Sequence, residues 1–81
     1  MNKDKEQVRL LDLEDGRTGI IISITGGKML TKRLADLGLS TGTKIKILRK
    51  TPFSGPVQVE VRSSKLVLGR GLAYKIMVEI Q

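Results

Sequence analysis

The sequence predicts a mainly β protein: a small β-barrel with one inserted α-helix. Three observations indicate this fold class. The chain has 81 residues, a length that suits one small domain. Apolar and polar residues alternate in several short segments, as they do in half-buried strands. A single segment repeats its apolar residues at helical spacing instead. Short strands at close spacing are typical of a small closed barrel.

The N-terminal part predicts a tail followed by a buried strand. Residues 1–7 are polar, and we expect them to form a disordered tail, so the folded domain is assigned to residues 8–81. The first strand is predicted over residues 17–25, where four isoleucines lie in a β-branched run. Gly26 and Gly27 end this strand.

One amphipathic helix is predicted over residues 28–37. Leu30, Leu34 and Leu37 lie at i, i+4 and i+7, so they share one face, which we expect to be buried. Gly38 follows at the position where helices often end with a left-handed residue. The helix is therefore expected to stop there.

The remainder of the chain indicates β-structure. A turn over residues 40–43 places Gly42 where a type II turn needs positive φ. Alternating apolar and polar residues then predict strands over residues 44–50, 57–62, 65–68 and 75–80. An irregular hairpin loop over residues 52–56 and a turn or single helical turn over residues 69–74 connect them.

The composition excludes several classes of chemistry. Cysteine and histidine are absent, which removes disulfides, zinc sites, iron-sulfur clusters and the imidazole and thiolate ligands of iron. The eight acidic residues lack the spacing of a calcium loop. Ile22 and Met29 stand where a phosphate-binding loop needs glycine and a hydroxyl residue. We therefore expect no catalytic, cofactor or metal site, and a protein that is not an enzyme.

The positive charge is concentrated in one third of the chain. The net charge is +7, and residues 28–50 hold seven basic residues against Asp36 alone. Such a segment is typical of a surface that binds an acidic partner, whether nucleic acid, lipid or protein. The alternative is a surface that only faces solvent. Phe53 and Tyr74 are the only aromatic residues that could stack on bases, so nucleic acid stays an alternative with weak, non-specific phosphate contacts.

The sequence also bears on location. No apolar stretch follows the N-terminal residues as it would in a secretory signal. The longest strictly aliphatic run covers only residues 20–22, far short of a membrane span. We expect a cytoplasmic protein that reaches a membrane only through a partner.

The run from Leu34 to Thr43, Leu-Ala-Asp-Leu-Gly-Leu-Ser-Thr-Gly-Thr, resembles the FeoA family, small accessory proteins of ferrous iron transport. The resemblance also includes the preceding Lys-Arg pair, the strand over residues 57–62 and the closing segment from Leu66 to Val78, and it extends from about Leu10 to Ile80. The family usually has proline where Thr41 stands, and threonine is compatible with the same turn.

This resemblance implies an SH3-like barrel with an inserted helix. It also implies a role at the cytoplasmic face of the membrane ferrous iron transporter that carries a GTPase domain, FeoB. The same domain type occurs at the C-terminus of iron-dependent repressors, so a regulatory module of that kind is a second alternative. The chain lacks a helix-turn-helix segment with which to bind operator DNA.

The expected contact surface is the helix with its flanking turn. Lys28, Lys32 and Arg33 are expected to meet acidic groups, and Leu39, just past the helix, is expected to be an exposed apolar anchor. Arg49 belongs to the same candidate set. Arg33, Arg49 and Arg70 are candidates for an arginine finger, which would stabilise the charge of phosphoryl transfer on a GTPase. The sequence leaves a homo-oligomer open.

Overall fold

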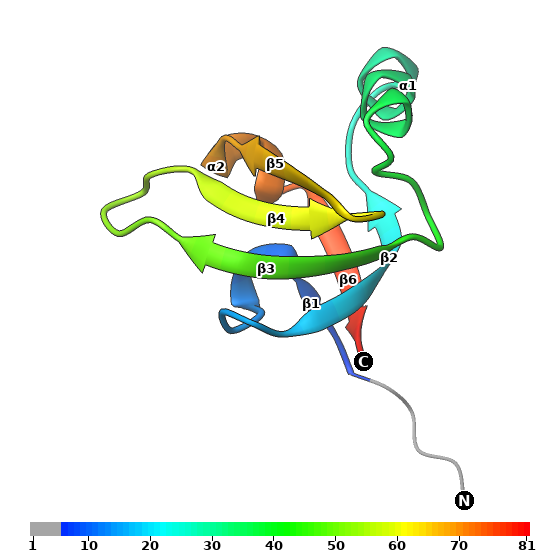
Figure 1. The fold of residues 1–81 in the computed structure, drawn as a ribbon. Coiled ribbons are helices and arrows are strands. Elements are labelled where there is room, and N and C mark those ends of the chain that lie inside the picture. Colours follow the sequence, from blue (N-terminus) through cyan, green and yellow to red (C-terminus); the bar gives the residue numbers. More distant parts are fainter. Residues whose placement is uncertain (1–5) are drawn as a thin grey trace, which may run out of the picture.

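The computed structural model describes residues 6–81 and shows one curved antiparallel sheet with a helix set apart from it (Figure 1). The strand order in the sheet is β1-β6-β2-β3-β4-β5. The elements in chain order are β1 (Gln7–Arg9), the 3₁₀ helix η1 (Leu10–Asp12), β2 (Thr18–Ile24), α1 (Lys28–Asp36), β3 (Lys44–Lys50), β4 (Val57–Val61), β5 (Ser64–Leu68), α2 (Arg70–Ala73) and β6 (Ile76–Ile80).

The predicted class, mainly β with an inserted helix, is confirmed, but the sheet is not a closed barrel. Among the described residues the strand order begins at β1 and ends at β5, which do not pair with each other. β1 has only three residues, too few to close the sheet along its full length. The sheet is nevertheless bent, because the register shifts within β2 and within β3, as at a β-bulge. The result is an open, barrel-like sheet.

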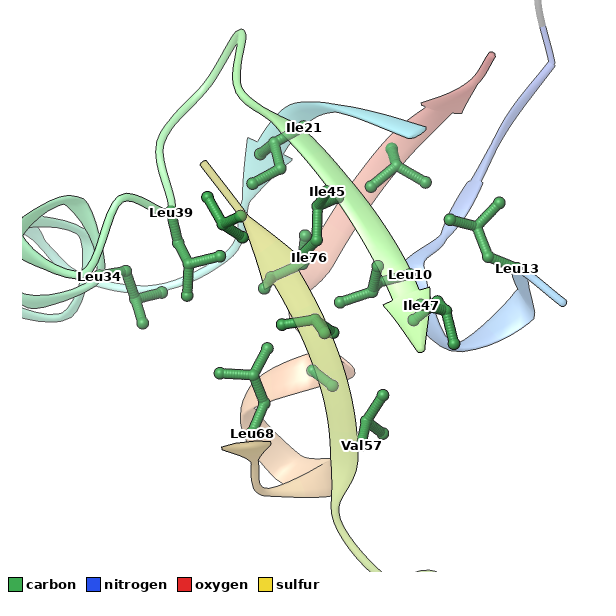
Figure 2. Packing of buried hydrophobic residues seen from close by; sticks show 14 residues of the cluster. Leu10, Leu13, Ile21, Leu34, Leu39, Ile45, Ile47, Val57, Leu68 and Ile76 are labelled. Atoms are coloured by element: carbon green, nitrogen blue, oxygen red, sulfur yellow. The ribbon is translucent and has the colours of Figure 1, made fainter. Parts of the chain in front are cut away.

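The core fills the concave side of this sheet (Figure 2). The alternation predicted from the sequence decides which side chains enter it: Ile45 and Ile47 of β3 are fully buried, and the lysines that alternate with them, Lys44 and Lys46, are exposed. The buried apolar residues are Leu10, Leu13, Ile21, Leu34, Leu39, Ile45, Ile47, Val57, Val59, Val61, Leu68, Ala73, Ile76 and Val78.

The N-terminal segment contains structure that the sequence patterns did not predict. Gln7, assigned above to the tail, begins β1, which pairs antiparallel with β6; residues 1–5 lie outside the described part of the chain. Leu10 and Leu13 enter the core from η1 and the residue after it. The ammonium group of Lys50 donates to the carbonyl oxygens of Leu11 at 3.0 Å and Leu13 at 2.6 Å. Lys50 therefore ties η1 to the end of β3.

The helices are short. α1 spans nine residues, one fewer than the predicted helix over residues 28–37, and α2 is a single turn of four, one of the two alternatives predicted for residues 69–74. Within residues 6–81 neither has the length or the apolar character to cross a bilayer.

Candidate partner-binding surface

α1 buries fewer residues than β2 or β3, although it is longer than either strand. It projects from the end of β2, away from the strands (Figure 1). Of its nine residues only Leu34 is buried, and Leu30 is half-buried. Met29 is 79% exposed and Leu37, at the C-cap, is 52% exposed. The predicted burial of Leu34 is confirmed, but the expectation that Leu37 shares its buried face is wrong.

The geometry at the end of α1 explains why Leu37 is exposed and Leu39 is buried instead. Gly38 adopts φ +90°, its N–H donates to the carbonyl of Ala35 at 2.9 Å, and the N–H of Leu39 donates to the carbonyl of Leu34 at 2.8 Å. This pair of hydrogen bonds is the Schellman motif, in which the chain reverses and the second residue past the cap packs against the last turn. Leu39 accordingly lies beside Leu34 in Figure 2 and is fully buried. The expectation that Leu39 is an exposed anchor is wrong.

Two exposed residues of α1 and its exposed C-cap form a stripe that the sequence patterns did not predict. Met29, Arg33 and Leu37 lie at i, i+4 and i+8, and all three are exposed. At a rise of about 1.5 Å per residue the stripe is about 12 Å long. We call these three residues the α1 stripe. Their four-residue spacing was visible in the sequence, but it was not separated there from the buried pair Leu30 and Leu34.

Two more predicted residues lie beside the stripe. Lys28 and Lys32 are exposed and one turn apart, on the ridge that continues to Asp36. The structure thus brings Lys28, Lys32 and Arg33 together on one short helix, as expected. Arg49 is also exposed but lies on β3, so it is not part of the α1 surface.

The turn that follows α1 has the predicted geometry. Gly42 adopts φ +94°, and the N–H of Thr43 donates to the carbonyl of Ser40 at 3.1 Å. This closes the four-residue turn with glycine at the position that needs positive φ. The turn leads directly into β3, where Lys44, Lys46 and Arg49 are exposed.

Two other arginines are engaged within the chain. The Arg70 guanidinium donates to the carbonyl oxygens of Thr51 at 2.8 Å and Gly55 at 3.2 Å, and so holds the loop between β3 and β4. Arg70 is therefore poorly placed to be the arginine finger that the sequence left open to it. The Arg9 guanidinium lies 4.6 Å from the centroid of the Tyr74 ring, a cation–π contact.

The described residues hold no group of three or more His, Cys, Asp or Glu side chains that could bind a metal ion. The expected absence of metal, cofactor and catalytic sites stays a prediction.

A family model described as FeoA domain matches residues 8–80. The chain is 38% identical over 66 residues to Fe(2+) transport protein A of Methanocaldococcus jannaschii. This match covers 82% of this chain and 78% of that protein. It is 29% identical over 73 residues to a fusion of Fe(2+) transport protein A and Fe(2+) transporter FeoB in Porphyromonas gingivalis. That match covers 90% of this chain and 9% of the fusion protein.

Solved structures agree with the fold. A crystal structure of an iron uptake regulatory protein, FeoA, superposes with a TM-score of 0.86 at 32% identity, covering 94% of this chain and 100% of that one. A manganese-dependent transcriptional repressor superposes with a TM-score of 0.84 at 24% identity, covering 98% of this chain and 44% of the repressor. The second likeness concerns the fold alone.

Proposed function

Since the chain belongs to the FeoA family, we propose that it is an accessory protein of ferrous iron transport that docks through α1 onto a membrane transporter with a GTPase domain. The relative in which the two are fused supports this partner, because a fusion holds a domain and its target at high effective concentration. On this proposal the protein acts at the cytoplasmic face, reaches the membrane through its partner and contributes no catalytic residue.

The exposure of the α1 stripe carries the proposal. Met29 and Leu37 place large apolar side chains in solvent on a helix that buries one residue. Covering two such side chains in a complex would remove apolar surface from water, and an arginine between them can pair with a carboxylate at the centre of the contact. An exposed helix with apolar and arginine anchors fits a groove on a protein partner.

The flanking lysines add long-range attraction. Lys28 and Lys32 are exposed next to the stripe, so an acidic surface around the partner's groove would be drawn to this end of the molecule. Their expected effect is on the association rate and on its salt dependence. The apolar contacts of the stripe should persist when salt screens the charges.

The structure offers less support to the nucleic-acid alternative. Tyr74 is occupied by the Arg9 guanidinium, and Phe53, although 98% exposed, stands at the tip of a loop remote in sequence from the basic helix. Lys50 is bound to backbone carbonyls. The seven basic residues of the central third therefore do not form the single belt with stacking platforms that single-stranded nucleic acid requires.

The decisive experiment removes the stripe without touching the core. The double variant Met29→Ser, Leu37→Ser is expected to weaken binding to the purified transporter in lipid nanodiscs by about 10- to 100-fold, since buried anchors dominate such interfaces. Phe53→Ser is the control, because it removes an even more exposed apolar side chain from another part of the surface. Equal affinities for the double variant and the wild type would show that α1 is not the docking element.

Charge reversal on α1 tests the electrostatic contribution to docking. Lys28→Glu, Lys32→Glu, Arg33→Glu should slow association with the transporter several-fold or more while the circular dichroism spectrum stays unchanged. All three positions are exposed, and negative groups in the first turn favour the helix dipole. Unchanged association kinetics at low salt would contradict an electrostatic contribution from this helix.

A further inference from the structure

We propose that a cationic trough on the outer side of the sheet binds an extended acidic peptide segment of a protein partner. The trough consists of two adjoining hollows of about 480 Å³ and about 240 Å³ that share Lys44 and Arg62 in their walls. Lys46 completes a set of three cations, and Glu60 is the single acidic residue in the lining. Five of the other six lining residues are serine or threonine.

The cations of the trough stand on rigid structure. Lys44 and Lys46 point outward from β3 because Ile45 and Ile47, which alternate with them, are fully buried in the core. A charged group mounted on a strand of this kind loses little backbone freedom when it binds, so less of the attraction is spent on ordering the site.

Arg62 is positioned by a turn and by the end of α1. Arg62 and Ser63 have φ of 52° and 67°, the left-handed pair of a type I′ hairpin between β4 and β5. The stem of Arg62 lies over Gly38, whose added Cβ would stand 3.8 Å from Arg62 Cδ and 4.0 Å from Nε. Both distances are ordinary van der Waals contacts, so the end of α1 lies next to Arg62 without displacing it from the lining of the trough.

The spacing of the cations favours an extended peptide. Residues two apart on a strand are about 6.6 Å apart, so Lys44 and Lys46 match carboxylates at alternate positions of an extended segment. Hydroxyl groups around them can donate further hydrogen bonds to those carboxylates. No aromatic side chain lines either hollow, so the trough lacks the platform on which nucleic-acid bases stack.

This site is separate from the α1 stripe and does not depend on the docking proposed above. None of Met29, Arg33 and Leu37 lines the trough, and none of the trough cations lies on α1. A partner could engage either surface alone.

The test titrates the ¹⁵N-labelled full chain with a capped peptide, acetyl-Glu-Ser-Glu-Ser-Glu-amide, and follows amide shifts. We expect the shifts to concentrate in residues 40–46 and 60–63. Lys46→Gln and Arg62→Gln should each weaken binding by about two- to five-fold, and Glu60→Gln should strengthen it by about two-fold, because it removes the one like charge. A gain of affinity of this sign would not arise from loss of structure.

Two controls separate the trough from general electrostatics. Arg49→Gln removes a cation from the same strand outside both hollows and should leave the affinity unchanged, as should Met29→Ser, Leu37→Ser. A peptide of the same composition with its three Glu residues contiguous should bind more weakly. Equal losses for Arg49→Gln and Lys46→Gln, no shift at the trough, or tighter binding of an oligothymidylate of equal charge at the same amides would each overturn the proposal.

Discussion

α1 and β3 lie close in the sequence and expose equal numbers of basic residues, yet they are anchored in different ways. β3 places two isoleucines in the centre of the core, with cations alternating on its outer side. α1 has two more residues than β3 but buries only Leu34. The exposed cations are Lys28, Lys32 and Arg33 on α1 and Lys44, Lys46 and Arg49 on β3.

The difference shows that equal charge does not make equal surfaces. On β3 the charges are held by the core, and the strand itself carries no exposed large apolar side chain such as Met29 or Leu37. Binding there should be governed by salt and by charge count. On α1 the charges accompany apolar side chains that gain from being covered, so binding should retain a part that salt does not screen.

The largest loss of stability should come from a substitution in β3, the element that the core holds in place. Ile45→Ala removes a fully buried side chain between two strands, and we expect a loss of about 2 to 5 kcal/mol from transfer and cavity terms. A domain of this size has a total stability of roughly 4 to 12 kcal/mol, so the denaturant midpoint should fall markedly. A midpoint within error of the wild type would show that β3 does not hold the core together.

A smaller and more local effect is expected from the helix. Leu34→Ala should destabilise the protein by about 2 kcal/mol, at the low end of the range for buried leucines. Leu34 is the only buried residue of α1, so the helix can shift to fill the cavity that the substitution leaves. Amide hydrogen exchange should accelerate in α1 and remain slow in β3 and β4. Acceleration that is uniform over all three elements would mean that α1 and the barrel unfold as one unit.

The smallest effects distinguish two lysines of β3. Lys50→Met removes the donor to the carbonyls of Leu11 and Leu13, and we expect a loss of about 1 to 3 kcal/mol. Lys46→Met, on the exposed side of the same strand, should change stability by less than about 0.5 kcal/mol. Thermal melts of the two variants measure the contrast, and similar shifts in both would contradict a structural role for Lys50.

Much of the fold follows from local patterns. The strand predicted over residues 44–50 has the bounds of β3, and its alternation holds as far as Ile47, because the period of a strand and the burial of one face leave little freedom; beyond Ile47 the register shifts. The helix and its glycine stop were likewise predictable. The type II turn required glycine at one position, and Gly42 occupies it.

The rest depended on contacts between distant segments. Leu37 and Leu39 are both leucines at the end of a helix, and only the chain reversal at Gly38 decides which of them is buried. Lys50 looked like one more member of the basic segment until the fold brought it within hydrogen-bonding distance of Leu11 and Leu13. Sequence spacing carries no information about a partner some forty positions away, so the division of the basic residues between surfaces could not be predicted.

The hydrogen bonds at the base of α1 bear on how the chain is connected. The N–H of Ile21 donates to the carbonyl of Thr43, and the N–H of Gly42 donates to the carbonyl of Ile21, so the chain rejoins the sheet beside β2, near the point where it left at Ile24. The segment over residues 25–41 is therefore an excursion that begins and ends on neighbouring strands. Because closing a loop costs only about 0.6 kcal/mol more for each doubling of its length, the barrel would tolerate a longer or shorter excursion there with its strand register intact. The exposed residues of this excursion are thus open to exchange, provided that Leu34 and Leu39 keep their places in the core.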